Sequence, residues 1–422
     1  MNPTDWLLAA GVLAGGLAVL GLLLARPRLG VFLLAFLTPL QYFTRIGPKA
    51  TLIKFIGIAV MAIWIAAKLI RKESMLEVFE NPLMLPVLAY GGLGFLSFYW
   101  AQDATYWENA ALTYMQLVAW MFLFIDSIQE EKHLEIILLA LTAGTLVSAS
   151  YSIYEYFGSA SWAFYRRATG GFGDGNYSAI SYLFVMPFLS NVARNRGGWT
   201  RILALGALLN LIMAIVLTVS RTGILGLILL GLLELYAARR MKQRLWLLLL
   251  MVVGVYLITT FLPVENVLYR FQEAFSSGSA TDMGGRLSLI RELSPRLIVY
   301  PWGIGWGGAP SILVAHNLFL EVGVQLGILG IILMGWVWHS AWILLQKAQM
   351  QASSGANAHL EQLLLMLRNT LVIYLFCSLT VSNESQRTLW LLFALIAAAH
   401  QLSTSQPVRS DARVLVLNPE SS

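Results

Sequence analysis

Long apolar segments alternate with short polar connections along nearly the whole chain, and each segment is long enough to cross a hydrocarbon core of about 30 Å. We predict helices, because open strands cannot satisfy their backbone hydrogen bonds in lipid. The predicted spans are residues 5–25, 29–46, 51–70, 82–100, 109–128, 133–157, 176–193, 199–219, 222–239, 244–262, 317–346, 362–382 and 387–402. The pattern predicts an all-α, polytopic integral membrane protein with about 12–13 transmembrane helices.

The composition agrees with this class. The 422-residue chain is 58% hydrophobic and 12% charged, whereas soluble domains carry about 25% charged residues. The single cysteine, Cys377, excludes a disulfide framework and a thiolate metal cluster. The net charge of +6 is explained by basic cytoplasmic loops, so we expect membrane lipids, and no nucleic acid, as partners.

The basic connections distinguish the two sides of the membrane. Lys and Arg concentrate at residues 68–72, 194–201, 239–244 and 347–368, which fall on one side of the predicted spans and are therefore expected to be cytoplasmic. The other side receives residues 102–108, 158–176, 220–222, 263–316 and 383–387. We predict one transmembrane domain over residues 1–422, with a large outward loop at 263–316 that carries short helices, and a cytoplasmic tail at 403–422.

Two arginines on the outward side are candidates for an anion site. Arg221 separates two apolar helices, and no acidic residue is nearer in sequence than Glu234. An arginine at the edge of a bilayer is costly without an anion, and its planar fork fits a phosphate or a carboxylate. The alternative is an arginine that extends to the lipid headgroups. Arg286 follows a glycine pair, whereas Arg291 would lie about 140° further round a helix and face elsewhere.

His316 lies on the outward side at the start of a predicted helix. The partial positive charge of a helix N-terminus disfavours imidazolium, so the ring is expected to be neutral near pH 7 and able to act as a general base. The alternative is an interface histidine with an ordinary hydrogen bond. Asn317 and Glu321 share one helix face, and Glu321 is expected to pair with an arginine or a buried polar group.

Two glycine-rich outward segments, residues 169–177 and 301–308, contain further candidate residues. Residues 169–177 follow a helix rather than a strand, which excludes a nucleotide-binding fingerprint, and Asn176 is predicted to cap the next helix. Trp302 and Trp306 alternate with glycines, where they either stack on sugars or anchor at the interface. The sequence has no metal-ligand spacing, so we expect chemistry without a metal or a cofactor.

Together these motifs resemble the O-antigen ligase and O-antigen polymerase superfamily. The matching motifs are Gly171-Phe172 with Asn176, Ser220-Arg221-Thr222-Gly223, Gly285-Arg286, Pro301-Trp302-Gly303-Ile304-Gly305, and the run from His316-Asn317 to Gly327. The resemblance implies a glycosyltransferase of the bacterial inner membrane that takes a glycan from undecaprenyl diphosphate at the periplasmic face. The acceptor is the lipid A–core oligosaccharide for ligases and another lipid-linked glycan for polymerases.

The resemblance also implies roles for individual residues. Arg221 and Arg286 would hold the donor diphosphate and stabilise its developing charge. His316 would take the proton from the acceptor hydroxyl as it attacks and inverts the anomeric carbon. The candidate substrate-binding residues are Asn176, Arg291, Asn317, Glu321, Trp302 and Trp306. Arg291 departs from the family pattern, which commonly has an aromatic residue followed by a small one.

Three functions remain open at this point. The compact loop and modest length favour a ligase over a polymerase. A transporter of lipid-linked glycans is the alternative from another class, and it would carry polar residues near the middle of the membrane in broken helices. The sequence shows no matching pair of such helices, and its candidate residues lie at one face, which favours an enzyme.

Overall fold

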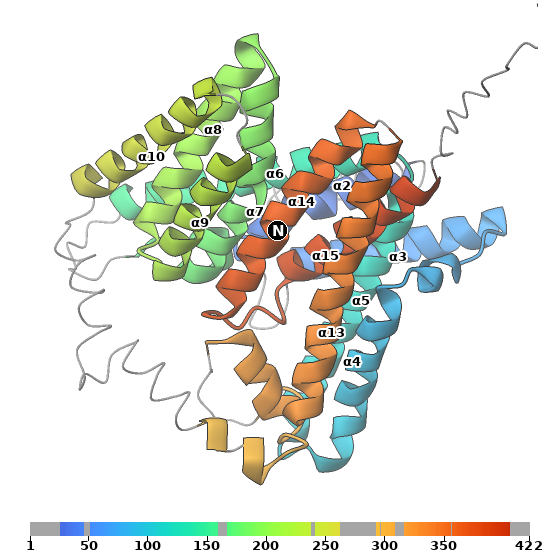
Figure 1. The fold of residues 1–422 in the computed structure, drawn as a ribbon. Coiled ribbons are helices and arrows are strands. Elements are labelled where there is room, and N and C mark those ends of the chain that lie inside the picture. The colour runs from blue at the N-terminus through green and yellow to red at the C-terminus, as the bar shows by residue number, and fades with distance from the viewer. Residues whose placement is uncertain are drawn as a thin grey trace, which may run out of the picture.

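The computed structural model describes residues 26–45, 51–158, 167–237, 241–261, 293–295, 297–308, 316–355 and 357–405. Within these ranges the protein consists of α-helices and short 3-10 turns, without a β-strand (Figure 1). The helices are α2 (Pro27–Leu37), α3 (Leu52–Arg71), α4 (Met84–Leu96), α5 (Ala104–Ser127), α6 (Glu131–Gly158), α7 (Gly175–Asn195), α8 (Gly198–Leu217), α9 (Arg221–Ala237), α10 (Met241–Phe261), α13 (Leu318–Ser354), α14 (Ala358–Ser378) and α15 (Arg387–Ser405).

These helices confirm the all-α, polytopic class. Every described helix overlaps a predicted span, and 6 helices are long and apolar enough to cross a membrane, namely α3, α5, α6, α8, α13 and α14. The first predicted span, residues 5–25, lies outside the described residues, as does most of the predicted outward loop. The described part of that loop is 293–295, 297–308 and residue 316, with helical turns at 293–295 and 297–299.

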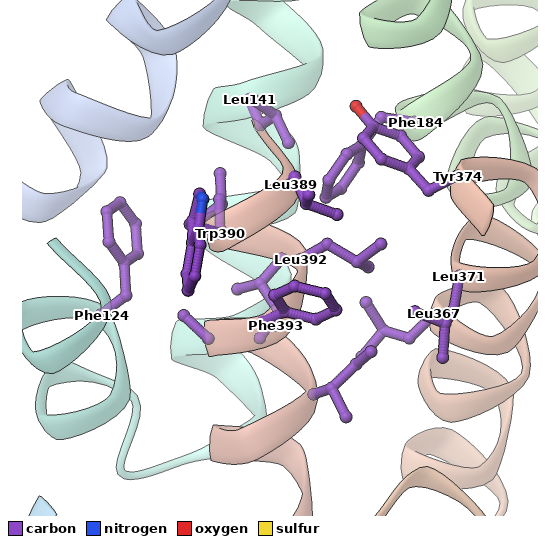
Figure 2. Close-up of a cluster of buried hydrophobic side chains, with 14 of the residues drawn as sticks. Phe124, Leu141, Phe184, Leu367, Leu371, Tyr374, Leu389, Trp390, Leu392 and Phe393 are labelled. Atoms are coloured by element: carbon purple, nitrogen blue, oxygen red, sulfur yellow. The ribbon is translucent and has the colours of Figure 1, made fainter. Parts of the chain in front are cut away.

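Helix α15 lies at the centre of the bundle. Each residue from 389 to 399 has an exposed fraction of 0%, as expected for a helix that is surrounded by others. Figure 2 shows Trp390 and Phe393 of α15 between Phe124 of α5 and Tyr374 of α14. The Trp390 and Phe393 rings pack edge to face, with centroids 5.9 Å apart. The loop 379–386 directly precedes this buried helix.

The connections between helices gather at two opposite ends of the bundle. One end contains the basic connections and their ion pairs, including Lys68 Nζ to Asp126 Oδ1 at 2.7 Å and Arg194 with Glu234. The other, here named the site end, contains the connections 97–103, 167–174, 218–220, 301–308, 316–317 and 379–386. The sorting of connections into two ends agrees with the sequence-based topology.

Helix α13 differs from the continuous helix predicted over 317–346. It is broken at Gly327, whose φ of 70° and ψ of −164° form a conformation essentially restricted to glycine. The carbonyls of Val324 and Gln325 accept hydrogen bonds from the backbone N–H groups of Ile304 and Gly305, each at 3.0 Å. The strip 301–308 therefore satisfies backbone groups that the break releases, as a buried helix break in a membrane protein requires. A single glycine in an apolar helix gave no sequence signal for this break.

Candidate active site

The loop 379–386, between α14 and α15, joins the elements that carry the candidate residues. The Leu379 carbonyl accepts a hydrogen bond from Asn317 Nδ2 at 2.8 Å. The hydroxyl oxygens of Thr222 and Thr380 lie 2.8 Å apart. Because Asn317 precedes α13 and Thr222 belongs to the first turn of α9, the starts of both helices are attached to one loop.

Arg221 is the first residue of α9 and is half-buried. Ser220 caps this helix, because its Oγ accepts a hydrogen bond from Gly223 N at 3.1 Å. A Cβ at Gly223 would lie 2.5 Å from Ala179 Cβ, so the glycine lets α9 pack closely against α7. The Ser-Arg-Thr-Gly motif thus fixes the start of α9, and with it Arg221, at the site end. Glu234 is paired with Arg194 at the opposite end.

The Asn176 side chain links the first turn of α7 to Ser220 and Arg167 instead of capping a helix. Its Oδ1 accepts hydrogen bonds from Ser220 Oγ at 2.8 Å and from Arg167 Nη2 at 3.1 Å. The prediction that Asn176 caps α7 is wrong, since the helix begins one residue earlier. Asp174 is the cap, with its Oδ1 accepting from Asn176 N at 2.8 Å and from Tyr177 N at 3.1 Å.

His316 lies just before the cap of α13, where the sequence places it. Asn317 is the N-cap, with its Oδ1 accepting from Leu320 N at 3.0 Å. His316 has a φ of 50°, which is uncommon for a residue other than glycine and is found disproportionately at functional sites. Both ends of the Asn317 amide bond within the protein, so this side chain fixes the backbone that directly follows His316.

A polar cluster lies one turn further along α13. Gln325 Nε2 donates to Glu321 Oε1 at 3.2 Å and to Glu384 Oε1 at 2.8 Å. Ser382 Oγ donates to Glu321 Oε2 at 3.4 Å. Glu321 therefore bonds to polar groups of the same cluster, one of the two kinds of partner that we predicted.

Glu384 was not selected from the sequence. Its Oε2 atom is buried and has no hydrogen-bond partner among the described residues. Burial, and to a lesser extent the nearby Glu321 carboxylate, raise the pKa of Glu384 to about 8, against the opposing effect of the hydrogen bond from Gln325. The available signal was a lone acidic residue in a short outward connection between two apolar segments.

A cavity of about 280 Å³ opens beside Glu384, lined by residues of α5 that include Tyr106, Asn109 and Thr113. Trp306 also lines it, but this residue is only 4% exposed and packs against Tyr114 with ring centroids 4.9 Å apart.

The other tryptophan of the glycine-rich strip 301–308 is placed differently. Trp302 is 63% exposed, and its carbonyl accepts a hydrogen bond from Trp100 Nε1 at 3.1 Å. Of the two tryptophans, only Trp302 presents most of its ring to the surroundings.

Arg286 and Arg291 lie outside the described residues. Within the described part of the chain, no group of three His, Cys, Asp or Glu side chains is placed to hold a metal ion.

The fold and this site define a class: a multi-pass helical membrane protein whose polar candidate residues converge at one end of the bundle. Residues 205–335 match the family model described as O-antigen ligase. The matched segment includes Arg221, Trp302, His316 and Glu321. The match supports the resemblance to the O-antigen ligase superfamily that the motifs indicated. Members of this family are ligases or related polymerases that use lipid-linked glycans. A comparison with curated proteins found no match.

Proposed function

We propose that the protein is an O-antigen ligase of the bacterial inner membrane. It transfers a glycan from undecaprenyl diphosphate to the lipid A–core oligosaccharide at the periplasmic face, without a metal ion. The observation that carries the proposal is the attachment of the starts of α9 and α13 to the loop 379–386, which places Arg221 and His316 at one end of the bundle inside the family match.

The chemistry requires a cation for the donor and a base for the acceptor. Arg221, together with Arg286, binds the diphosphate, and the N-terminus of α9 adds partial positive charge at the same place. His316 accepts the proton of the acceptor hydroxyl while the oxygen attacks the anomeric carbon. The bond from that carbon to the diphosphate oxygen breaks, undecaprenyl diphosphate leaves with the electron pair, and the anomeric carbon is inverted.

Two alternatives use the same residues. A polymerase would pass the glycan to a second lipid-linked glycan, with the same base and the same anion site. A transporter would bind the donor without making a bond, and the break in α13 at Gly327 is the observation in its favour. The strip 301–308 holds both sides of that break by backbone hydrogen bonds, including Ile328 N to Pro301 O at 3.1 Å, which favours a fixed enzyme site.

The test uses the full-length protein in lipid nanodiscs with an undecaprenyl-diphosphate glycan and lipid A–core, with a chelator present. A ligase forms glycosylated lipid A–core, which a gel resolves from both substrates. Lengthening of the lipid-linked glycan without modification of lipid A–core would identify a polymerase. Binding of the donor without either product would identify a transporter and contradict the proposal.

A further inference from the structure

An apolar groove between α3 and α5 lies outside the candidate active site. Its volume is about 290 Å³, and apolar side chains line most of it. It opens to the surroundings of the bundle, since Ile58 on its wall is 65% exposed. Two cationic side chains, Lys54 and Arg387, also line the groove. We name it the α3–α5 groove.

Arg387 carries a charge that no described acidic side chain balances. Among the described residues it takes part in no ion pair. Its Nη1 donates to Gln41 Oε1 at 2.9 Å, and its guanidinium lies 5.6 Å from the ring centroid of Trp120. It is also the first residue of α15, whose first turn has no acidic residue, so the helix N-terminus adds further positive charge. An arginine in this position is costly within a membrane unless an anion accompanies it.

Lys54 adds a second positive charge beside the first. The two side chains are close enough for their charges to repel each other. Two like charges beside an apolar groove are complementary to a molecule with an anionic head and an apolar tail. We propose that the α3–α5 groove binds an anionic phospholipid of the bilayer, with its phosphate at Lys54 and Arg387 and one acyl chain along Gly57 and Met61.

The site is placed to influence the loop 379–386. Arg387 directly follows this loop, and Gln41, which accepts from Arg387, donates through Nε2 to Gln386 Oε1 at 3.4 Å. The candidate active site is attached to the same loop through α9 and α13, whereas the groove is formed by α3 and α5. A bound phospholipid therefore braces the loop from the side of α3 and α5. This inference does not depend on which glycan reaction the protein performs.

The test is native mass spectrometry of the full-length protein in detergent, titrated with phosphatidylglycerol or phosphatidylcholine. We expect one tightly held phosphatidylglycerol and weaker retention of phosphatidylcholine. Arg387→Gln should weaken phosphatidylglycerol binding about five- to tenfold, the effect of losing one cation near a lipid phosphate. Arg71→Gln, at the exposed far end of α3, should leave binding unchanged.

A second variant tests the tail without touching the charges. A Cβ at Gly57 would lie 3.5 Å from Trp120, an ordinary contact, so Gly57→Leu fits the backbone and extends into the groove. It should weaken phosphatidylglycerol binding, whereas Gly92→Leu, at an exposed glycine of α4 with open space around it, should not. Unchanged binding in both Arg387→Gln and Gly57→Leu would overturn the proposal. So would equal binding of phosphatidylcholine, or one-for-one displacement of phosphatidylglycerol by undecaprenyl diphosphate.

Discussion

The hydroxyl oxygens of Thr222 and Thr380 lie 2.8 Å apart and join the first turn of α9 to the loop 379–386. Thr222 is only 2% exposed, and it directly follows Arg221. Since Asn317 is bonded to the same loop at Leu379, the distance between the proposed anion site and the proposed base depends on this loop. Changes in its contacts should therefore alter catalysis more than stability.

Thr222→Val tests this coupling, because valine keeps the shape and removes the hydroxyl. Thr380 Oγ1 retains its hydrogen bond to the Cys377 carbonyl at 3.1 Å, so the loss of stability should be about 1 kcal/mol. Glycan transfer should fall while substrate binding by the rest of the protein persists. Thr200→Val, which removes an exposed hydroxyl at the opposite end, is the control. Equal transfer by both variants would exclude the coupling.

The break in α13 predicts that alanine substitutions at two glycines of this helix change the stability of the protein in opposite directions. A Cβ at Gly327 would lie 1.9 Å from the Pro301 carbonyl oxygen, and the backbone conformation there excludes other residues. Gly327→Ala should therefore cost about 3 kcal/mol or more. Gly335→Ala has open space and should stabilise the helix by about 0.5–1 kcal/mol. Thermal unfolding in detergent compares them, and similar midpoints would contradict the described break.

The raised pKa of Glu384 predicts that the stability of the protein depends on pH. Its pKa is raised from an ordinary 4.5 to about 8 in the folded protein, so the folded state binds this proton more tightly than the unfolded state does. The stabilising contribution is present below the ordinary pKa and is lost as the pH rises through about 8. Glu384→Gln should remove this loss, which falls between the two pKa values, about pH 5 to 8, whereas Glu108→Gln, at an exposed position, should keep it. Parallel unfolding profiles for the wild type and Glu384→Gln would contradict the assignment.

Arg221→Lys tests whether the arginine fork, rather than charge alone, is needed for the donor diphosphate. Lysine keeps the charge but loses the planar pair of donors, so transfer should fall about 100-fold, the effect of removing one donor to a developing anion. Arg71→Lys at the opposite end should behave as the wild type. Retention of full transfer by Arg221→Lys would show that a point charge suffices.

Periodicity was enough to predict the class of fold, because the length of an apolar segment reports directly on a membrane span. The helix starts near Arg221 and His316 were also predictable, since turn residues act locally. The cap of α7 was nevertheless assigned to Asn176 instead of Asp174. Glu384 and the loop 379–386 were not found, because their importance arises from contacts with α9 and α13, which are distant in sequence. The break at Gly327 was missed for a similar reason: the strip that stabilises it is a separate segment of the chain.

We propose His316 as the base of a glycan transfer, and the transfer rate of His316→Ala tests this role most directly. The assay compares it in nanodiscs with the wild type and with His359→Ala, an exposed histidine at the opposite end. We expect His316→Ala to fold normally, to bind the donor and to transfer about 100- to 10,000-fold more slowly, while His359→Ala remains active. Transfer by His316→Ala at the wild-type rate would contradict the account and direct attention to Glu384 and Glu321.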